Sequence, residues 1–377
     1  MTTIDFKQRV STRLAFLAAG MAMSAWAPLV PFAKERMGLE QAELGMLLLC
    51  LGVGSLMAMP LTGIFASRFG CRLVILLSGL LTCLTLPLLA LVPSPILLAI
   101  VLFAFGASIG TLDVSMNIQA VIVEKNQGGS LMSGFHGLFS VGGFVGAGTM
   151  TFLLWGGLGI LWSSIIVAGL VAIALLIANP NLLRNPEATE RDGPLFVLPH
   201  GTVIFIGILC FIIFLAEGAM LDWSALLLTS GGLSAAQGGL GYAAFSVAMT
   251  VGRLTGDKVV TRFGGKRVMF IGGLFAAAGF FVAVFSPNPF VALLGFVLIG
   301  LGASNIVPIL FTAAGRQKDM PSGLAISAVT TIGYAGILAG PALIGFVAHA
   351  SSLHMAFAGL GCAMLLITAS ASRATRN

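Results

Sequence analysis

Three acidic side chains lie inside long apolar stretches of the sequence: Asp113, Glu217 and Asp222. Even on a lenient scale, a charge at the centre of a bilayer costs on the order of 2.5–3.5 kcal/mol, so each acid needs a partner or a watery cavity. Asn117 lies one helical turn beyond Asp113, on the same face. We expect Asp113 and Glu217 to bind and release protons. A structural hydrogen bond between helices is the alternative for Asp113, although a neutral amide would provide it at lower cost.

Polar and aromatic side chains in the same apolar stretches are candidates for binding a small molecule. The predicted set is Asn117, Trp26, Trp223, Asn305, Tyr334 and His136. The two tryptophans are equally consistent with packing, and His136 with a satisfied residue at a helix start. Tyr334 precedes Gly336-x-x-x-Gly340, a spacing that is typical of close helix packing.

The elements that must position these residues are membrane helices. Hydrophobic residues make up 58% of the chain and charged residues only 8%, against about 25% charged in a soluble domain. A membrane span needs about 20 apolar residues, and the sequence offers twelve such stretches: 12–33, 43–66, 73–91, 96–122, 131–153, 158–178, 201–228, 238–257, 268–285, 290–314, 322–347 and 354–371. Their length without alternation predicts an all-α integral membrane protein.

Four short strings occur twice, at a separation of about half the chain. Ala22-Met23-x-x-Trp26 returns ending at Trp223, and Pro93-x-Pro95 returns as Pro287-x-Pro289. Likewise, Arg68-Phe69-Gly70 returns as Arg262-Phe263-Gly264, and Gly106-Ala107-Ser108 as Gly302-Ala303-Ser304. The same order at nearly one offset indicates a duplicated half, which is typical of transporters with a site between two repeats. Prolines after Trp26 predict a break in the outer part of the first span.

The polar segments set the predicted domain boundaries and orientation. We expect a six-helix bundle over 1–180, a cytoplasmic linker over 181–200 and a second six-helix bundle over 201–377. With the N-terminus in the cytoplasm, 17 of the 19 Lys and Arg residues fall on the cytoplasmic side and two, Lys34 and Arg36, fall outside. This bias predicts that both termini are cytoplasmic. The net charge of +6 therefore reflects topology, and we expect no nucleic-acid partner.

The motifs of several other protein classes do not occur in the sequence. The five cysteines lack paired spacing, and no metal site is expected. The chain has no Walker loop and no HExxH, so ATP-driven transport and zinc-dependent hydrolysis of the HExxH type are not predicted. We expect no enzyme activity and no cofactor.

Several longer strings carry a resemblance to a known family. Gly63-Ile-Phe-Ala-Ser-Arg68-Phe-Gly70-Cys-Arg72 is similar to the cytoplasmic signature of the major facilitator superfamily, with Ser67 and Thr261 at the usually acidic position of each half. The strings around Asp113, His136, Glu217 and Arg253 resemble the YbjJ-type bacterial inner-membrane group, related to fucose permease. The resemblance implies twelve helices in the major facilitator fold and alternating access.

The resulting hypothesis is a proton-coupled secondary transporter of a small polar, sugar-like solute in a bacterial inner membrane. Arg68, Arg72, Arg253, Asp257 and Arg262 would form its inner gate; a surface salt bridge of under about 1 kcal/mol is the alternative for the Arg253–Asp257 pair. The expected partners are the lipid bilayer, the solute and protons, and we expect a monomer. An exporter of amphipathic compounds is the main alternative, because the chain holds 16 Met and 27 Phe. A membrane sensor is a weaker one, since no long loop could hold a signalling domain.

Overall fold

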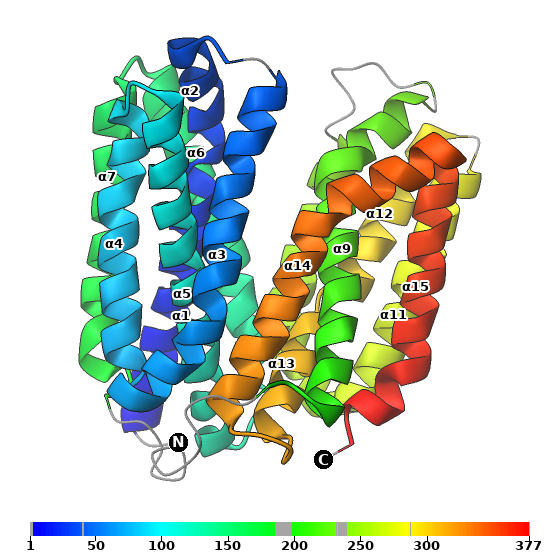
Figure 1. Cartoon of the computed structure of the whole chain (residues 1–377). Coiled ribbons are helices and arrows are strands. Elements are labelled where there is room, and N and C mark those ends of the chain that lie inside the picture. Colours follow the sequence, from blue (N-terminus) through cyan, green and yellow to red (C-terminus); the bar gives the residue numbers. More distant parts are fainter. Residues whose placement is uncertain are drawn as a thin grey trace. The chain divides into compact units, whose positions relative to one another are not determined.

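The computed structural model describes residues 3–39, 41–184, 198–230, 232, 240–286 and 288–376. Within these ranges the regular structure is entirely helical (Figure 1). The helices are α1 (Thr3–Ala25), α2 (Val30–Met37), α3 (Gln41–Phe69), α4 (Cys71–Leu91), α5 (Pro95–Gln127), α6 (Met132–Trp155), α7 (Ile160–Ala178), α9 (Gly201–Ser230), α10 (Leu240–Phe263), α11 (Gly265–Phe285), α12 (Pro289–Ala303), α13 (Ile306–Arg316), α14 (Ser322–Ala350) and α15 (Leu353–Ala374), with short 3-10 turns η1 (Ala27–Leu29) and η2 (Asn179–Asn181).

Eleven segments within the described ranges are long and apolar enough to cross a membrane. They match eleven of the twelve predicted stretches. The remaining stretch, 238–257, corresponds to α10, which is as long as its neighbours. Helix α10 carries Arg253, Asp257, Lys258 and Arg262, and these charges lower its hydropathy. The predicted all-α membrane architecture is therefore confirmed.

The chain divides into two compact units, which follow the two halves of the sequence apart from two short segments. The first unit comprises Met1–Gly128, Leu138–Leu198 and Met320–Ser327, and the second comprises Gly129–Gly137, Pro199–Asp319 and Ala328–Asn377. In the first unit, the hydroxyl of Ser327 donates to the main-chain oxygen of Met59 at 2.5 Å. Of the predicted linker 181–200, residues 185–197 lie outside the described part of the chain.

The repeated strings build equivalent turns in the two units. Pro95 and Pro289 each stand at the first position of a helix, α5 and α12, after a side-chain cap from Ser94 and Asn288. Proline suits this position because its missing N–H would have no partner there. Gly70 and Gly264 have φ angles of +81° and +79°, which favour glycine. Each glycine ends one helix and lets the next begin at the following residue.

The first predicted span is broken where its prolines predicted. Helix α1 ends at Ala25, the 3-10 turn η1 contains Pro28, and α2 begins at Val30. Proline lacks the N–H that continues an α-helix and clashes with the preceding turn. The prediction of a break in this span is confirmed. The repeat-related helix α9 runs without interruption from Gly201 to Ser230.

Glycines bring helices of each unit into close contact. In the first unit, a Cβ atom added to Gly106 on α5 would lie 1.9 Å from the main-chain oxygen of Leu51 on α3. The hydroxyl of Ser55 donates to the main-chain oxygen of Gly106 at 2.8 Å in the same interface. In the second unit, a Cβ on Gly302 would lie 2.5 Å from the main-chain oxygen of Gly272. Small residues allow this approach, and dispersion and hydrogen bonds then stabilise the helix pairs in lipid.

Candidate functional site

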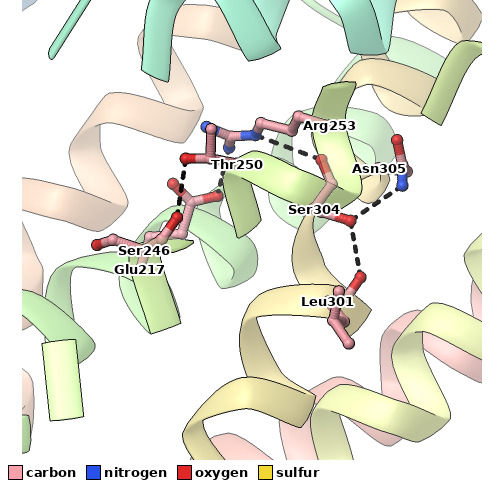
Figure 2. Close-up of polar contacts among 7 residues, drawn as sticks. All are labelled: Glu217, Ser246, Thr250, Arg253, Leu301, Ser304 and Asn305. Carbon is pink, nitrogen blue, oxygen red and sulfur yellow. Dashed lines mark hydrogen bonds and ion pairs between the residues drawn. The ribbon is translucent and has the colours of Figure 1, made fainter. Parts of the chain in front are cut away.

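An ion pair lies within the second unit, between α9 and α10. The guanidinium Nη2 of Arg253 lies 3.2 Å from Oε1 of Glu217, and the two side chains are only 8% and 20% exposed. Figure 2 shows the two groups facing each other. Glu217 is the 17th of 30 residues in α9 and Arg253 the 14th of 24 in α10, so both lie near the middle of their helices. Pairing offsets the cost of placing each charge inside a membrane-spanning segment.

The same arginine contacts a break between α12 and α13. The predicted span 290–314 is interrupted at Ser304 and Asn305, and α13 begins at Ile306. The cause is Pro308, which has no N–H to donate to the carbonyl of Ser304, four residues earlier. The Nε of Arg253 donates to this main-chain oxygen at 3.4 Å. Arg253 therefore joins the Glu217 carboxylate to a carbonyl that the helix leaves unused (Figure 2).

Asn305 closes this break against α10. Its Nδ2 donates to the main-chain oxygen of Gly252 at 3.1 Å and to Oγ of Ser304 at 2.9 Å. The Asn305 side chain fits against α10 because residue 256 is a glycine. A Cβ on Gly256 would lie 1.8 Å from Oδ1 of Asn305. Asn305 is 8% exposed. The structure thus gives this predicted binding residue a role in holding the break.

In the first unit, Asp113 and Asn117 are neighbours on α5. The Nδ2 of Asn117 donates to the main-chain oxygen of Asp113 at 2.9 Å and reaches Oδ1 of Asp113 at 3.5 Å. Asp113 is half-buried, and within the described residues its carboxylate has no cation partner. Asn117 is 1% exposed, and its Oδ1 lacks a hydrogen-bond partner in that part of the chain.

The repeat-related tryptophans share one feature. The indole Nε1 groups of Trp26 and Trp223 are both buried and have no hydrogen-bond partner among the residues that the structure describes. Trp26, in the first unit, is 5% exposed. Trp223, in the second, packs toward α14, where a Cβ on Gly345 would lie 3.5 Å from its Cζ2. Buried polar groups are usually paired, so these two donors require an explanation.

The remaining predicted binding residues, His136 and Tyr334, lie in aromatic surroundings of the second unit. The His136 ring centroid is 5.7 Å from that of Phe311, and the Tyr334 ring contacts Phe214 edge-on at 6.1 Å. His136 is only 9% exposed.

The five predicted gate residues have separate surroundings. In the second unit, Oδ1 of Asp257 accepts from the main-chain N–H of Gly134 at 2.9 Å. Gly134 is in the first turn of α6, where N–H groups have no intrahelical partner and favour a carboxylate. Arg68 and Arg262 each lie over the phenylalanine ring that follows them, at 5.5 and 5.4 Å. Arg72 donates from Nε to Oδ1 of Asn179 at 2.7 Å.

The Glu217–Arg253 pair and the helix break are the features that sequence reasoning missed. Two signals were present in the sequence. Arg253 lies within the predicted span 238–257, one helical turn from its end, and an arginine inside a span needs an acid as its partner. Pro308 lies inside the predicted span 290–314 and removes one helical hydrogen bond.

With this geometry established, comparison with known proteins identifies the family. The sequence model of the Major Facilitator Superfamily matches residues 14–231 and 206–374. The chain belongs to the major facilitator superfamily. An uncharacterised MFS-type transporter of Yersinia pestis is 57% identical over 370 residues, covering 98% of this chain and 96% of that protein. The membrane protein MosC of Rhizobium meliloti is 35% identical over 356 residues, covering 94% and 85%.

Solved structures show the same superfamily fold at low identity. The Escherichia coli fucose:proton symporter FucP superposes with a TM-score of 0.83 at 15% identity, covering 100% of this chain and 99% of that one. The human organic anion transporter MFSD10 superposes with a TM-score of 0.81 at 16% identity, covering 98% of this chain and 100% of that one. The proton:xylose symporter XylE gives 0.80 at 15%, covering 99% and 96%. This chain is thus a multi-pass membrane transporter with the major facilitator fold.

Proposed function

We propose that this transporter moves a small, neutral, polar solute of sugar-like chemistry across a bacterial inner membrane, together with protons and by alternating access. Both termini would face the cytoplasm, as the distribution of Lys and Arg indicates.

The observation that carries the proposed substrate class is the pair of unpartnered indole N–H groups. Trp26 and Trp223 occupy equivalent places in the repeated sequence, one in each unit, and each buries a donor that no described residue accepts. Asn117 adds an unsatisfied acceptor in the first unit. A solute with hydroxyl groups can both accept from an indole N–H and donate to an amide oxygen. The amphipathic indole also provides an apolar face for the carbon skeleton.

Proton coupling rests on the two acids near the centres of α5 and α9. Arg253 supplies a countercharge for Glu217. Asp113 has the amide of Asn117 within reach and no cation among the described residues, so a proton is the simplest way to remove its charge. We therefore assign the transported proton first to Asp113, with Glu217 as a second carrier that must separate from Arg253 before it is protonated. Two of the superposed structures, FucP and XylE, are proton symporters.

A binding screen tests the proposed substrate class. Purified full-length protein in detergent would be heated with a panel of neutral sugars and polyols, organic anions and cationic dyes. Ligand binding to the folded state alone raises the unfolding temperature in a concentration-dependent way. Stabilisation by a neutral polyhydroxy compound, with competition within that class, is expected. Stabilisation by the dyes or organic anions alone would contradict the proposal and favour the exporter.

A further inference from the structure

One corner of the second unit contains a groove that the ion pair, the helix break and the tryptophans do not use. It lies between the first turns of α11 and the last turns of α15 and has a volume of about 480 Å³. Its lining includes Lys266, Arg267, Phe270, Ile271 and Ala369. Sites for small organic molecules usually have volumes of about 300–1,000 Å³, so the groove is large enough to hold part of one.

The charged residues that line the groove are all positive. Lys266 and Arg267 are exposed, and neither side chain has a hydrogen-bond or ion-pair partner within the described ranges. The sequence contains no acid from residue 258 to 318 and none after Asp319, so α11 and α15 carry no acidic residue. Beyond the two cations, Phe270 and Ile271 leave 47% and 49% of their surface exposed. The groove therefore has two cations at one end and an exposed apolar surface along the membrane-spanning helices beyond them.

The equivalent corner of the first unit is filled by the chain itself. Lys266 corresponds in the repeat to Arg72, at the start of α4. Arg72 donates from Nε to Asn179 at 2.7 Å, and its main-chain N–H donates to the oxygen of Leu183 at 2.9 Å. Residues after α7 thus cover the first turn of α4 in that unit. In the second unit, the matching cation Lys266 has no hydrogen-bond or ion-pair partner among the residues that the structure describes.

We propose that the groove between α11 and α15 binds one anionic phospholipid of the surrounding membrane. The phosphate contacts Lys266 and Arg267, and an acyl chain lies along Phe270, Ile271 and Ala369. Charge complementarity selects this occupant, since a headgroup with a net negative charge is attracted to basic side chains at the membrane surface, whereas a zwitterionic headgroup also carries a cation. The apolar lining excludes a free phosphate as the full ligand, because it would leave the channel empty.

Photo-crosslinking locates the lipid directly. The full-length protein would be placed in phosphatidylcholine nanodiscs with a trace of phosphatidylglycerol whose acyl chain carries a diazirine. Peptide mapping should find the label on α11 and α15 near Phe270 and Ala369. A phosphatidylcholine probe with the same chain should label these peptides weakly. Labelling spread evenly over the other helices, or equal labelling by the two probes, would overturn the proposal.

Matched variants separate the site from general attraction to a basic protein. Lys266→Gln with Arg267→Gln should weaken phosphatidylglycerol binding roughly 30-fold, at about 1 kcal/mol for each cation. Lys258→Gln with Lys318→Gln removes the same charge from exposed positions of the same unit and should bind as wild type. Ala369→Phe fills the channel, keeps both cations and should also lose the label. Wild-type labelling in the Lys266/Arg267 variant or in Ala369→Phe would refute the site. Lys266→Arg with Arg267→Lys preserves both charges and should be labelled by phosphatidylglycerol as wild type is.

Discussion

At the scale of single residues, the pair of Glu217 and Arg253 determines the electrostatics of the second unit. Two charges near the centres of α9 and α10 stabilise each other, and the carbonyl left unused by Pro308 gives Arg253 a further acceptor. Breaking a buried pair leaves an uncompensated charge, whereas replacing both members is often nearly neutral.

The prediction for this pair is a non-additive double-mutant cycle. Glu217→Gln and Arg253→Met, each alone, should lower the stability of the folded protein by about 3–5 kcal/mol, and the double variant should recover most of the loss. Thermal unfolding in detergent measures the order of stabilities. Arg262→Gln, which changes an exposed arginine of the same helix, should unfold as wild type. Additive losses in the double variant would contradict the coupling.

The two buried indole donors make a prediction about binding. Trp26→Phe and Trp223→Phe keep an aromatic ring and remove the N–H, so each should weaken solute binding about 5- to 10-fold, the value of roughly 1 kcal/mol for one hydrogen bond. Trp162→Phe serves as the control, because Trp162 is 61% exposed. Titration with the solute found in the screen provides the measurement. Unchanged affinity in both variants would assign the tryptophans to packing.

At the scale of helices, glycine contacts fix which faces meet, and two adjacent glycines on α6 provide a test. A Cβ on Gly142 would lie 2.2 Å from the main-chain oxygen of Leu17 on α1, whereas a Cβ on Gly143 would meet nothing within 4 Å. Backbone cannot move aside as a flexible side chain can. Gly142→Ala should therefore cost about 1–3 kcal/mol, and Gly143→Ala should be tolerated. Equal unfolding temperatures for these two variants would show that α1 and α6 do not pack in this way.

The start of α9 makes a prediction about pH. Oδ2 of Asp319, in the connection before α14, accepts from the main-chain N–H of Thr202 at 2.8 Å. This hydrogen bond lowers the pKa of the Asp319 carboxyl below its usual value. Because the pKa is lower when folded than when unfolded, the stabilisation is present at neutral pH and is lost as the pH falls through the folded value. The acid is exposed, so the effect is small.

The measurement is the difference in unfolding temperature between wild type and Asp319→Asn as a function of pH. Wild type should be more stable at pH 7, and the difference should shrink below about pH 4, where aspartate ordinarily titrates. Lys318→Gln, next to it, should show no such pH dependence. A difference that is absent at pH 7 would mean that the contact at Thr202 contributes nothing.

At the scale of the whole molecule, the amino-acid sequence predicted the membrane-spanning helices and the break in the first of them, but not the break between α12 and α13. Long apolar stretches predicted the spans, and the prolines after Trp26 predicted the break in the first span. The structure adds that Pro95 and Pro289 begin α5 and α12, and that Gly70 and Gly264 form the turns between helices. These features depend on local composition and backbone geometry. The partner of Arg253 could not be predicted in this way, since a choice between Glu217, Asp222 and Asp257 depends on how helices pack.

The same reason separates the candidate site into predictable and unpredictable parts. Asp113 and Glu217 stand out in the sequence because acids are costly in apolar spans. The contact of Asp257 with α6 and the role of Asn305 in the helix break arise from tertiary contacts, and hydropathy carries no information about these. The predicted domain boundaries were drawn from the duplication of the sequence. Gly129–Gly137 lies in the first half of the sequence but belongs to the second compact unit, because its contacts are with that unit.

The central claim is that transport of the solute moves protons through Asp113. The most direct measurement uses full-length protein in proteoliposomes that contain a pH-sensitive dye, with a gradient of the solute identified in the screen. Wild type should show a solute-dependent change of internal pH, and so should Glu43→Gln, which changes an exposed acid at the start of α3. Asp113→Asn should still bind the solute but should move protons far more slowly than wild type, because only Glu217 remains as a carrier. Proton movement by Asp113→Asn at the wild-type rate and with the same pH dependence would contradict the claim.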